Sequence, residues 1–166
     1  MRTSMKDGTV YDIVPCAKDR WFEATELAFR VFMKYEAKEY GQKGIDSFAE
    51  FLTSPSLEKV FKAGKYIVYV AMLNDEIIGV TSVRSGNHLS LLFVNDSYHR
   101  QGIATKLILT VKEYLLNKTD YKTLTVHSSP YGIPFYEKMG FKATDEQLTG
   151  SDGIIYTPME LDLCSF

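Results

Sequence analysis

A polar turn that contains glycine links a strand-like segment to a helix-like segment in the middle of the chain. The strand-like residues from Leu91 to Val94 are apolar, and a helical pattern begins near Gly102. Such a junction aims the free backbone N–H groups of the first helical turn outward, where they and the helix dipole can hold an anion. Gly102 and Ala104 are small enough to let a phosphate group approach. The segment predicts a phosphate site, although a plain strand-to-helix connection has the same pattern.

Other phosphate-binding and metal-binding patterns are missing from the sequence. Neither GxxxxGK followed by Ser or Thr nor GxGxxG occurs, which removes support for an ATPase or a dinucleotide-dependent enzyme. The histidines are not paired at ligand spacing, so no metal site is predicted. Cys16 and Cys164 lie near opposite ends of the chain, and free thiols in a reducing compartment are expected.

Two segments in sequence order resemble the signatures of the GNAT acetyltransferases. The family's pyrophosphate loop reads Arg or Gln, two residues, Gly, one residue, Gly or Ala; Gly102 and Ala104 match it, and His99 takes the first position. The second signature reads Asn-x-x-Ala-x-x-Phe-Tyr, then Glu-Lys and Gly-Phe, with Ser129 and Gly132 replacing Asn and Ala here. Its matching residues are Phe135, Tyr136, Glu137, Lys138, Gly140 and Phe141. The resemblance runs from about residue 66 to residue 141.

The resemblance implies an N-acetyltransferase that uses acetyl-CoA and acts on a primary amine of a small molecule or peptide. By motif position, the expected cofactor-binding residues are Leu92, Phe93, Val94, His99, Arg100, Gln101, Gly102, Ile103, Ala104, Thr105, Ser129 and Tyr136. In the family, the strand before the loop splays from its neighbour, and its backbone groups at residues 92–94 would bind the pantetheine arm. Two alternatives remain open: an acyl-CoA-binding sensor or structural module without turnover, and a protein-interaction domain.

The resemblance assigns a proton-transfer role to Tyr136, which matches the tyrosine that often protonates the departing thiolate. A packed aromatic on an amphipathic helix is the alternative for this residue. His88 stands six residues before Val94, where some family members carry a catalytic glutamate, and it is the candidate base. Strand alternation would place residues 88, 90, 92 and 94 on one face. Glu36 and Glu39 are alternative bases, and an ordered water could also suffice.

The order of elements predicts a mixed α/β (α+β) domain in which helices flank a mostly antiparallel, twisted sheet of six to seven strands. Extended segments are expected near residues 9–14, 66–71, 77–83, 88–94, 123–127 and 154–161. Helices are expected over 19–35, 45–64, 100–117 and 133–139, the second with a new start at Ser54-Pro55. Ser47 and Glu50 have the spacing of a capping box.

Length and charge limit the remaining possibilities. A chain of 166 residues fits one domain spanning 1–166, and a formal charge of −2 without a basic stripe disfavours nucleic acid as a partner. No secretory signal or membrane-spanning run is present, so a cytoplasmic protein is expected. Acidic residues on the N-terminal helices could attract a cationic amine. The acceptor is not identified, and the chain is expected to be a monomer or a homodimer.

Overall fold

A twisted sheet forms the centre of the fold in the computed structural model, which describes residues 1–164. Nine strands in this range follow the order β1-β2-β3-β4-β5-β6-β9-β7, and β8 pairs with β9. Neighbouring strands are antiparallel except β5 and β6, which are parallel. The strands are β1 (Arg2–Ser4), β2 (Val10–Pro15), β3 (Ile67–Leu73), β4 (Glu76–Arg84), β5 (His88–Val94), β6 (Thr123–Ser128), β7 (Lys142–Ala143), β8 (Leu148–Thr149) and β9 (Ile155–Asp162).

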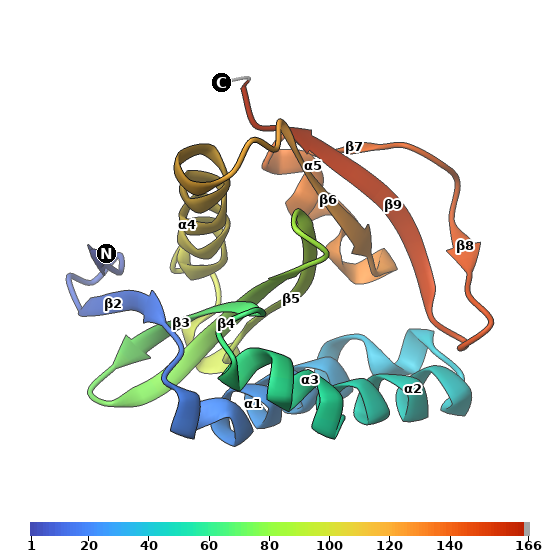
Figure 1. Ribbon diagram of the computed structural model, residues 1–166, viewed down its shortest axis with the longest axis horizontal. Helices are drawn as coiled ribbons and strands as arrows, with labels where there is room; N and C mark the ends of the chain where they lie inside the picture. The colour runs from blue at the N-terminus through green and yellow to red at the C-terminus, as the bar shows by residue number, and fades with distance from the viewer. Residues whose placement is uncertain (165–166) are drawn as a thin grey trace.

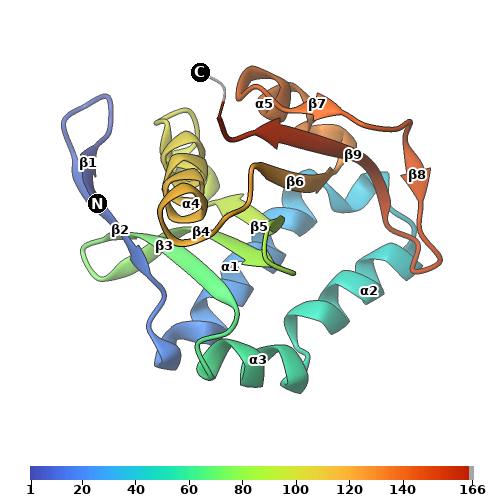
Figure 2. The same cartoon turned by 45° about the horizontal axis from the view of Figure 1, so that its top comes forward.

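Helices cover both faces of this sheet. Figures 1 and 2 show α1, α2 and α3 on one face and α4 on the other, with α5 beside β6 and β9. Apolar residues of α1 to α3 form one core cluster with β3 to β5, and those of α4 and α5 form a second cluster with β6 and β9. The helices are α1 (Trp21–Tyr35), α2 (Gln42–Leu52), α3 (Pro55–Lys62), α4 (Ile103–Lys118) and α5 (Ile133–Lys138), with short 3₁₀ turns η1 (Lys18–Arg20), η2 (Ala37–Glu39), η3 (Asp96–Tyr98) and η4 (Pro130–Gly132).

The mixed α/β class with an open, mostly antiparallel sheet is confirmed, but the expected six to seven strands are too few. The additional strands are β1, β7 and β8, which have three, two and two residues. Segments this short do not complete even two periods of strand alternation, so hydrophobic patterning cannot detect them. They extend the sheet at its margins and leave the centre as expected.

Of the two helix N-caps predicted from sequence, the one at Ser54 is confirmed and the one at Ser47 was wrong. The side chain of Ser54 accepts a hydrogen bond from the Leu57 amide at 3.3 Å and caps α3, with Pro55 in the first turn. Ser47 does not cap a helix, because α2 begins five residues earlier at Gln42. Its hydroxyl instead donates to the carbonyl oxygen of Asp152 at 2.7 Å, which fastens α2 to the loop before β9.

β5 departs from its neighbour β6 after a very short pairing. Only His88 and Leu89 pair with β6, at Thr125 and Val126, and the rest of β5 diverges (Figure 1). The splayed pair expected from the family resemblance is therefore present. Since the edge of β5 that faces β6 has no strand beside it from residue 90 onward, its backbone groups are open to a ligand.

A β-bulge at Ser90 corrects the expected alternation along β5. Ser82 of β4 pairs with Leu91 and Val83 pairs with Leu89, so Ser90 is an extra residue. Leu91 and Phe93 consequently face α1, whereas Leu92 and Val94 pack on the α4 side. The prediction that residues 88, 90, 92 and 94 share one face was wrong, because the bulge reverses the alternation between 90 and 92.

Candidate active site

A cavity of about 560 Å³ occupies the gap between the diverging strands β5 and β6. Its walls come from β5, the turn before α4, η4 with α5, and the C-terminal end of α1. Eight of the predicted cofactor-binding residues line it, namely Leu92, Phe93, Val94, His99, Arg100, Ala104, Ser129 and Tyr136. The two sequence segments that suggested a site thus meet in space.

The start of α4 offers free backbone N–H groups at one end of this cavity. Gly102 is the N-cap residue with φ of 80°, and Arg100 also has a positive φ of 63°. Within residues 1–164, the first amide of this turn that donates a backbone hydrogen bond is that of Lys106, to the Gly102 carbonyl at 3.0 Å. The amides of residues 100–105 are therefore available to an anion. The backbone angle rather than space requires glycine at 102, since a Cβ there would meet nothing within 4 Å.

The side chains of Ile103, Gln101 and His99 make contacts within the protein. Ile103 is buried in the core, so only its backbone can reach a ligand. The Gln101 side chain accepts a hydrogen bond from the Lys6 amide at 3.2 Å. His99 donates from Nε2 to the Val94 carbonyl at 2.7 Å, and its ring packs at a tilt against that of Tyr35, with centroids 5.1 Å apart. The side chains of Gln101, Ile103 and Thr105 lie outside the cavity lining.

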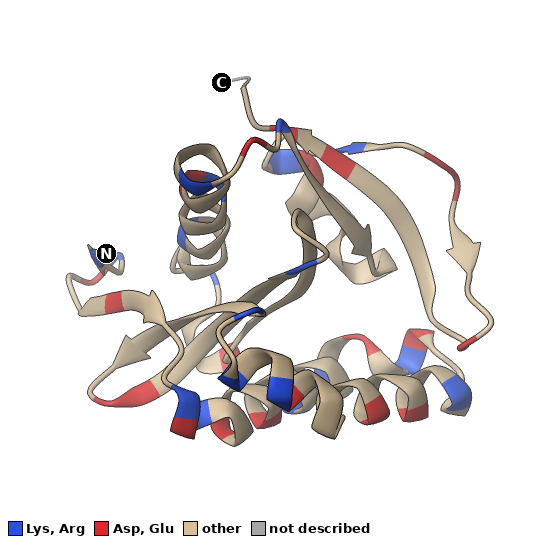
Figure 3. Ribbon diagram, in the orientation of Figure 1, with Lys and Arg blue, Asp and Glu red and all other residues tan. Residues whose placement is uncertain are grey.

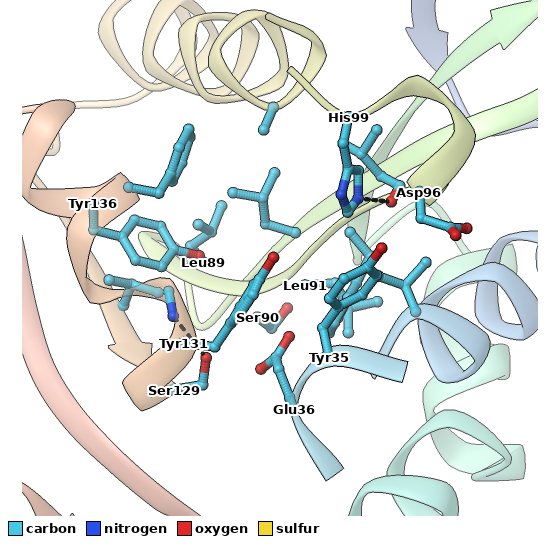
Figure 4. A pocket seen from close by; sticks show the side chains of 18 of the residues that line it. Tyr35, Glu36, Leu89, Ser90, Leu91, Asp96, His99, Ser129, Tyr131 and Tyr136 are labelled. Carbon is cyan, nitrogen blue, oxygen red and sulfur yellow. Dashed lines mark hydrogen bonds between the residues drawn. The ribbon is translucent and has the colours of Figure 1, made fainter. Parts of the chain in front are cut away.

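Tyr136 is a buried residue of α5 whose hydroxyl points into the cavity (Figure 4). Its ring packs edge-on against Phe135 and Phe141, with centroids 5.4 and 5.2 Å away. A Cβ at Gly132 would lie 3.1 Å from the Tyr136 ring, so an alanine there would require the ring to shift slightly. Burial, and then the negative field of Glu36, raise the pKa of Tyr136, so the hydroxyl keeps its proton across the physiological range.

Glu36 brings a carboxyl group to the same cavity from the end of α1. Figure 4 shows this side chain among Ser90, Ser129 and Tyr131. Burial raises the pKa of Glu36 to about 7, a hydrogen bond from Ser129 opposes the rise, and the charge of Glu39 adds to it. In the sequence, Glu36 and Glu39 were the two alternative bases, and their place at the end of the first helix was the only signal for either of them.

A second cavity of about 420 Å³ adjoins the first on the side of α2 and β9. Residues that line both cavities mark where the two meet: Glu36, Leu89, Ser90, Phe93, His127 and Ser129. The loop before β9 closes the far wall, where a Cβ at Gly44 would come within 2.7 Å of the Gly153 carbonyl oxygen. The arrangement therefore provides two compartments that open onto the carboxyl group of Glu36.

His88 lines the second cavity and not the first. Its Nδ1 is 2.8 Å from the Thr125 hydroxyl, and its ring lies edge-on to that of His127 at 4.5 Å. Burial, followed by the charges of His127 and Arg84, lowers the pKa of His88 to about 4. The imidazole is thus neutral at pH 7 and has little affinity for a proton.

Ser90 is held in the bulge by a ring of hydroxyl groups. The hydroxyl oxygens of Tyr66, Ser82 and Ser90 lie 2.7 Å from one another. This triangle fixes the Ser90 side chain, which Figure 4 shows facing Glu36. The sequence alone does not reveal Ser90 as a site residue, because a lone serine in an apolar strand gives no signal before the bulge is known.

Charged residues of both signs are interspersed over the helices (Figure 3). Of the acids on the N-terminal helices, Glu23 and Glu26 form ion pairs with Arg20 and Arg30. Glu36 is the one that lines both cavities. In residues 1–164, no helix is long and apolar enough to cross a membrane, and no group of three or more metal-binding side chains is found.

The chain belongs to the GNAT acetyltransferases, because the family model described as acetyltransferase (GNAT) domain matches residues 36–163. The resemblance inferred from sequence is thereby confirmed. The chain is an acyltransferase, and acetyl-CoA is the co-substrate of its family. The free amides at the start of α4 and the open edge of β5 fit this co-substrate, since they offer donors to a pyrophosphate and to an extended amide-containing arm.

Relatives agree with this assignment. The uncharacterized N-acetyltransferase YafP of Escherichia coli K12 is 29% identical over 121 residues, which cover 73% of this chain and 74% of that protein. A GCN5-related N-acetyltransferase from Rhodopseudomonas palustris has a TM-score of 0.79 at 16% identity, over 98% of both chains. The PaiA N-acetyltransferase of Thermoplasma acidophilum, solved with coenzyme A, has a TM-score of 0.72 at 19% identity, over 92% of this chain and 98% of that one. The structural likenesses establish the fold.

A negative charge at Ala104 should weaken coenzyme A binding without harming the helix. Ala104 lies in the first turn of α4 and lines the larger cavity. We expect Ala104→Glu to reduce affinity for coenzyme A about tenfold or more, from like-charge repulsion of about 1–4 kcal/mol at close range. Acids stabilise a helix start, so the melting temperature should not fall. Calorimetric titration against the neutral Ala104→Gln variant separates the effect of charge from that of bulk, and an unchanged affinity in Ala104→Glu would contradict a phosphate site here.

Proposed function

We propose that this protein transfers the acetyl group of acetyl-CoA to a primary amine by direct attack of the amine on the thioester. One observation carries the proposal: two cavities meet at Glu36, with the hydroxyl of Tyr136 pointing into the larger one. One compartment suits the co-substrate and the other an acceptor. A base and an acid therefore face the place where the two reactants would touch.

The larger cavity would hold acetyl-CoA, which supplies an activated acyl carbon. The amides of residues 100–105 would bind the pyrophosphate, and the open edge of β5 would bind the pantetheine arm through its backbone. The carbonyls of Val94 and Leu91 already accept hydrogen bonds from His99 and Thr81, so Leu92 and Phe93 would make most of these contacts. Arg100, which also lines the cavity, would add a positive charge near the phosphates.

Glu36 would receive the proton that the amine loses. As the amine nitrogen forms a bond with the acyl carbon, the carbon–sulfur bond breaks and the nitrogen must release a proton. A carboxyl group with a pKa of about 7 is half ionised at neutral pH and is well matched to this task. Ser90, fixed by Ser82 and Tyr66, would orient the carboxylate or a water between it and the amine.

Tyr136 would donate its hydroxyl proton toward the sulfur as negative charge develops there. Full transfer from a tyrosine to a thiolate is uphill, because the reference pKa values are about 10 and 8.5. A hydrogen bond that strengthens as the thiolate leaves is sufficient, and the raised pKa of Tyr136 keeps the donor protonated. The pKa of about 4 makes His88 a weak base, so we assign the role foreseen for it to Glu36.

A thiol-release assay tests the proposed function. Purified protein is titrated with acetyl-CoA by calorimetry and then incubated with a panel of primary amines and matched alcohols. We expect binding, thiol release that depends on the amine, and a product heavier by one acetyl group. Binding without turnover across the panel would favour the sensor alternative, and an alcohol acting as acceptor in place of amines would contradict amine transfer.

A further inference from the structure

We infer that the acceptor is an amine that also carries a carboxylate group on a flat apolar body, with Arg84 binding the carboxylate in the second cavity. This inference rests on the proposed function, since it names the substrate class of the same site. It is drawn from the position of Arg84, from the aromatic walls of the cavity and from the distribution of charge along it.

Arg84 lies at the end of β4 and lines the second cavity but not the first. Its guanidinium sits over the ring of Phe51, 5.9 Å from the centroid, which orients the group. None of the ion pairs within residues 1–164 includes Arg84. An oriented guanidinium at a cavity wall without an internal carboxylate partner is suited to a carboxylate brought by a ligand.

Aromatic rings form two walls of the same cavity. On the helix side, Phe48 lies 4.4 Å from Phe32 and 5.8 Å from Phe93, measured between ring centroids. On the strand side, His127 stacks on Tyr156 at 4.2 Å. Rings on both sides favour a planar apolar body between them, because aromatic groups gain from stacked and edge-on contacts.

Charge is separated along this cavity. Glu36 lies where the two cavities meet, and Arg84 belongs only to the part away from the co-substrate. The positive field of Arg84 reaches His88 and His127, where it contributes to lowering their pKa values. The other acid in the lining, Asp152, accepts a hydrogen bond from the Ile154 amide at 3.0 Å. An amine placed at Glu36 would therefore leave a carboxylate on the same molecule free to meet Arg84.

Matched acceptors test the inference. Thiol release is measured with para-(aminomethyl)benzoate and its carboxamide, and with phenylalanine and phenylalaninamide, which differ in the spacing between amine and carboxylate. We expect kcat/KM about tenfold to a hundredfold higher for the carboxylate in one of the pairs, the range expected for a charge-assisted hydrogen bond. Arg84→Gln should remove this preference and Arg84→Lys should keep part of it. Arg30→Gln, which removes the same charge from the exposed side of α1, should leave the preference intact.

The outcomes separate this inference from the proposed function. No acetylation of any amine would contradict the proposed function itself. Acetylation of the amides at rates equal to those of the carboxylates would overturn only the inference. A preference for the carboxylate that persists in Arg84→Gln, or a higher kcat/KM for para-(aminomethyl)phenylphosphonate than for the benzoate, would also overturn it.

Discussion

Glu36→Gln should lower kcat/KM by about 100- to 10,000-fold, the range contributed by a positioned general base. The substitution keeps the size of the side chain and its hydrogen-bonding capacity toward Ser129 but removes the proton acceptor. In the unmodified protein, kcat/KM should rise with pH through about 7, because the ionised carboxylate is the active form. That rise should vanish in Glu36→Gln and leave only the rise at the pKa of the amine. Initial rates of thiol release from pH 5.5 to 9 measure both effects.

Glu39→Gln and His88→Ala are the controls for this result. The charge of Glu39 makes only a minor contribution to the raised pKa of Glu36. Its substitution should therefore shift the rise in kcat/KM near pH 7 (the limb of the pH profile) slightly toward lower pH without removing it. His88→Ala should retain the limb, because an imidazole with a pKa of about 4 does not titrate there. Loss of the limb in His88→Ala with its retention in Glu36→Gln would contradict our assignment and favour the histidine.

Glu36→Gln should also be more stable than the unmodified protein at alkaline pH. A carboxyl group whose pKa is higher in the folded state binds more protons when folded, so the free energy of unfolding falls as pH rises from about 4.5 to about 7. The full shift corresponds to at most about 3 kcal/mol, and partial exposure of Glu36 reduces this to roughly 1–2 kcal/mol. Glu36→Gln avoids the loss, so its advantage in melting temperature should be larger at pH 8 than at pH 5. An equal difference at both pH values would show that Glu36 titrates normally.

The sequence predicted the elements with strong periodicity and the motifs within them. The four-residue repeat of Ile103, Leu107, Val111 and Leu115 identified α4, and these side chains are all buried. The glycine turn before it was located from residue types alone. Such features are local, because a helix face or a left-handed N-cap is specified by residues close together in the chain.

The features that could not be predicted depend on tertiary contacts. No residue type near Ser90 indicates a bulge in the sequence. In the fold, the hydroxyl of the extra residue Ser90 is hydrogen-bonded to those of Ser82 and Tyr66. Glu36 and Ser129 are far apart in the sequence, and the sheet formed by the residues between them brings their side chains into contact. The pKa values also depend on tertiary contacts. Burial lowers the pKa of His88 and raises that of Glu36, so Glu36 is the better base near neutral pH, although the sequence favoured His88. A charge on a side chain can be read from sequence, but its burial cannot.

Tyr136→Phe should lower kcat by about 100-fold or more, while the affinity for acetyl-CoA stays close to that of the unmodified protein. The ring is buried between Phe135 and Phe141, and phenylalanine fills the same space, so the fold and the cavity wall are preserved. The lost hydroxyl is the group that points into the cavity. Single-turnover thiol release and calorimetric titration separate the chemical step from binding.

A comparison with Tyr131→Phe tests whether the position of the hydroxyl matters. Tyr131 lines the same cavity, but it is 46% exposed and its ring packs at a tilt against Tyr35 with centroids 5.5 Å apart, so loss of its hydroxyl should change kcat only a few-fold. Because the pKa of Tyr136 is raised above its usual value of 10.0, the unmodified protein should show no decline in kcat below pH 10. A decline below that pH that disappears in Tyr136→Phe would place the pKa of the donor lower than burial allows. Equal losses in both variants would contradict a specific role for the Tyr136 hydroxyl in the departure of the thiol.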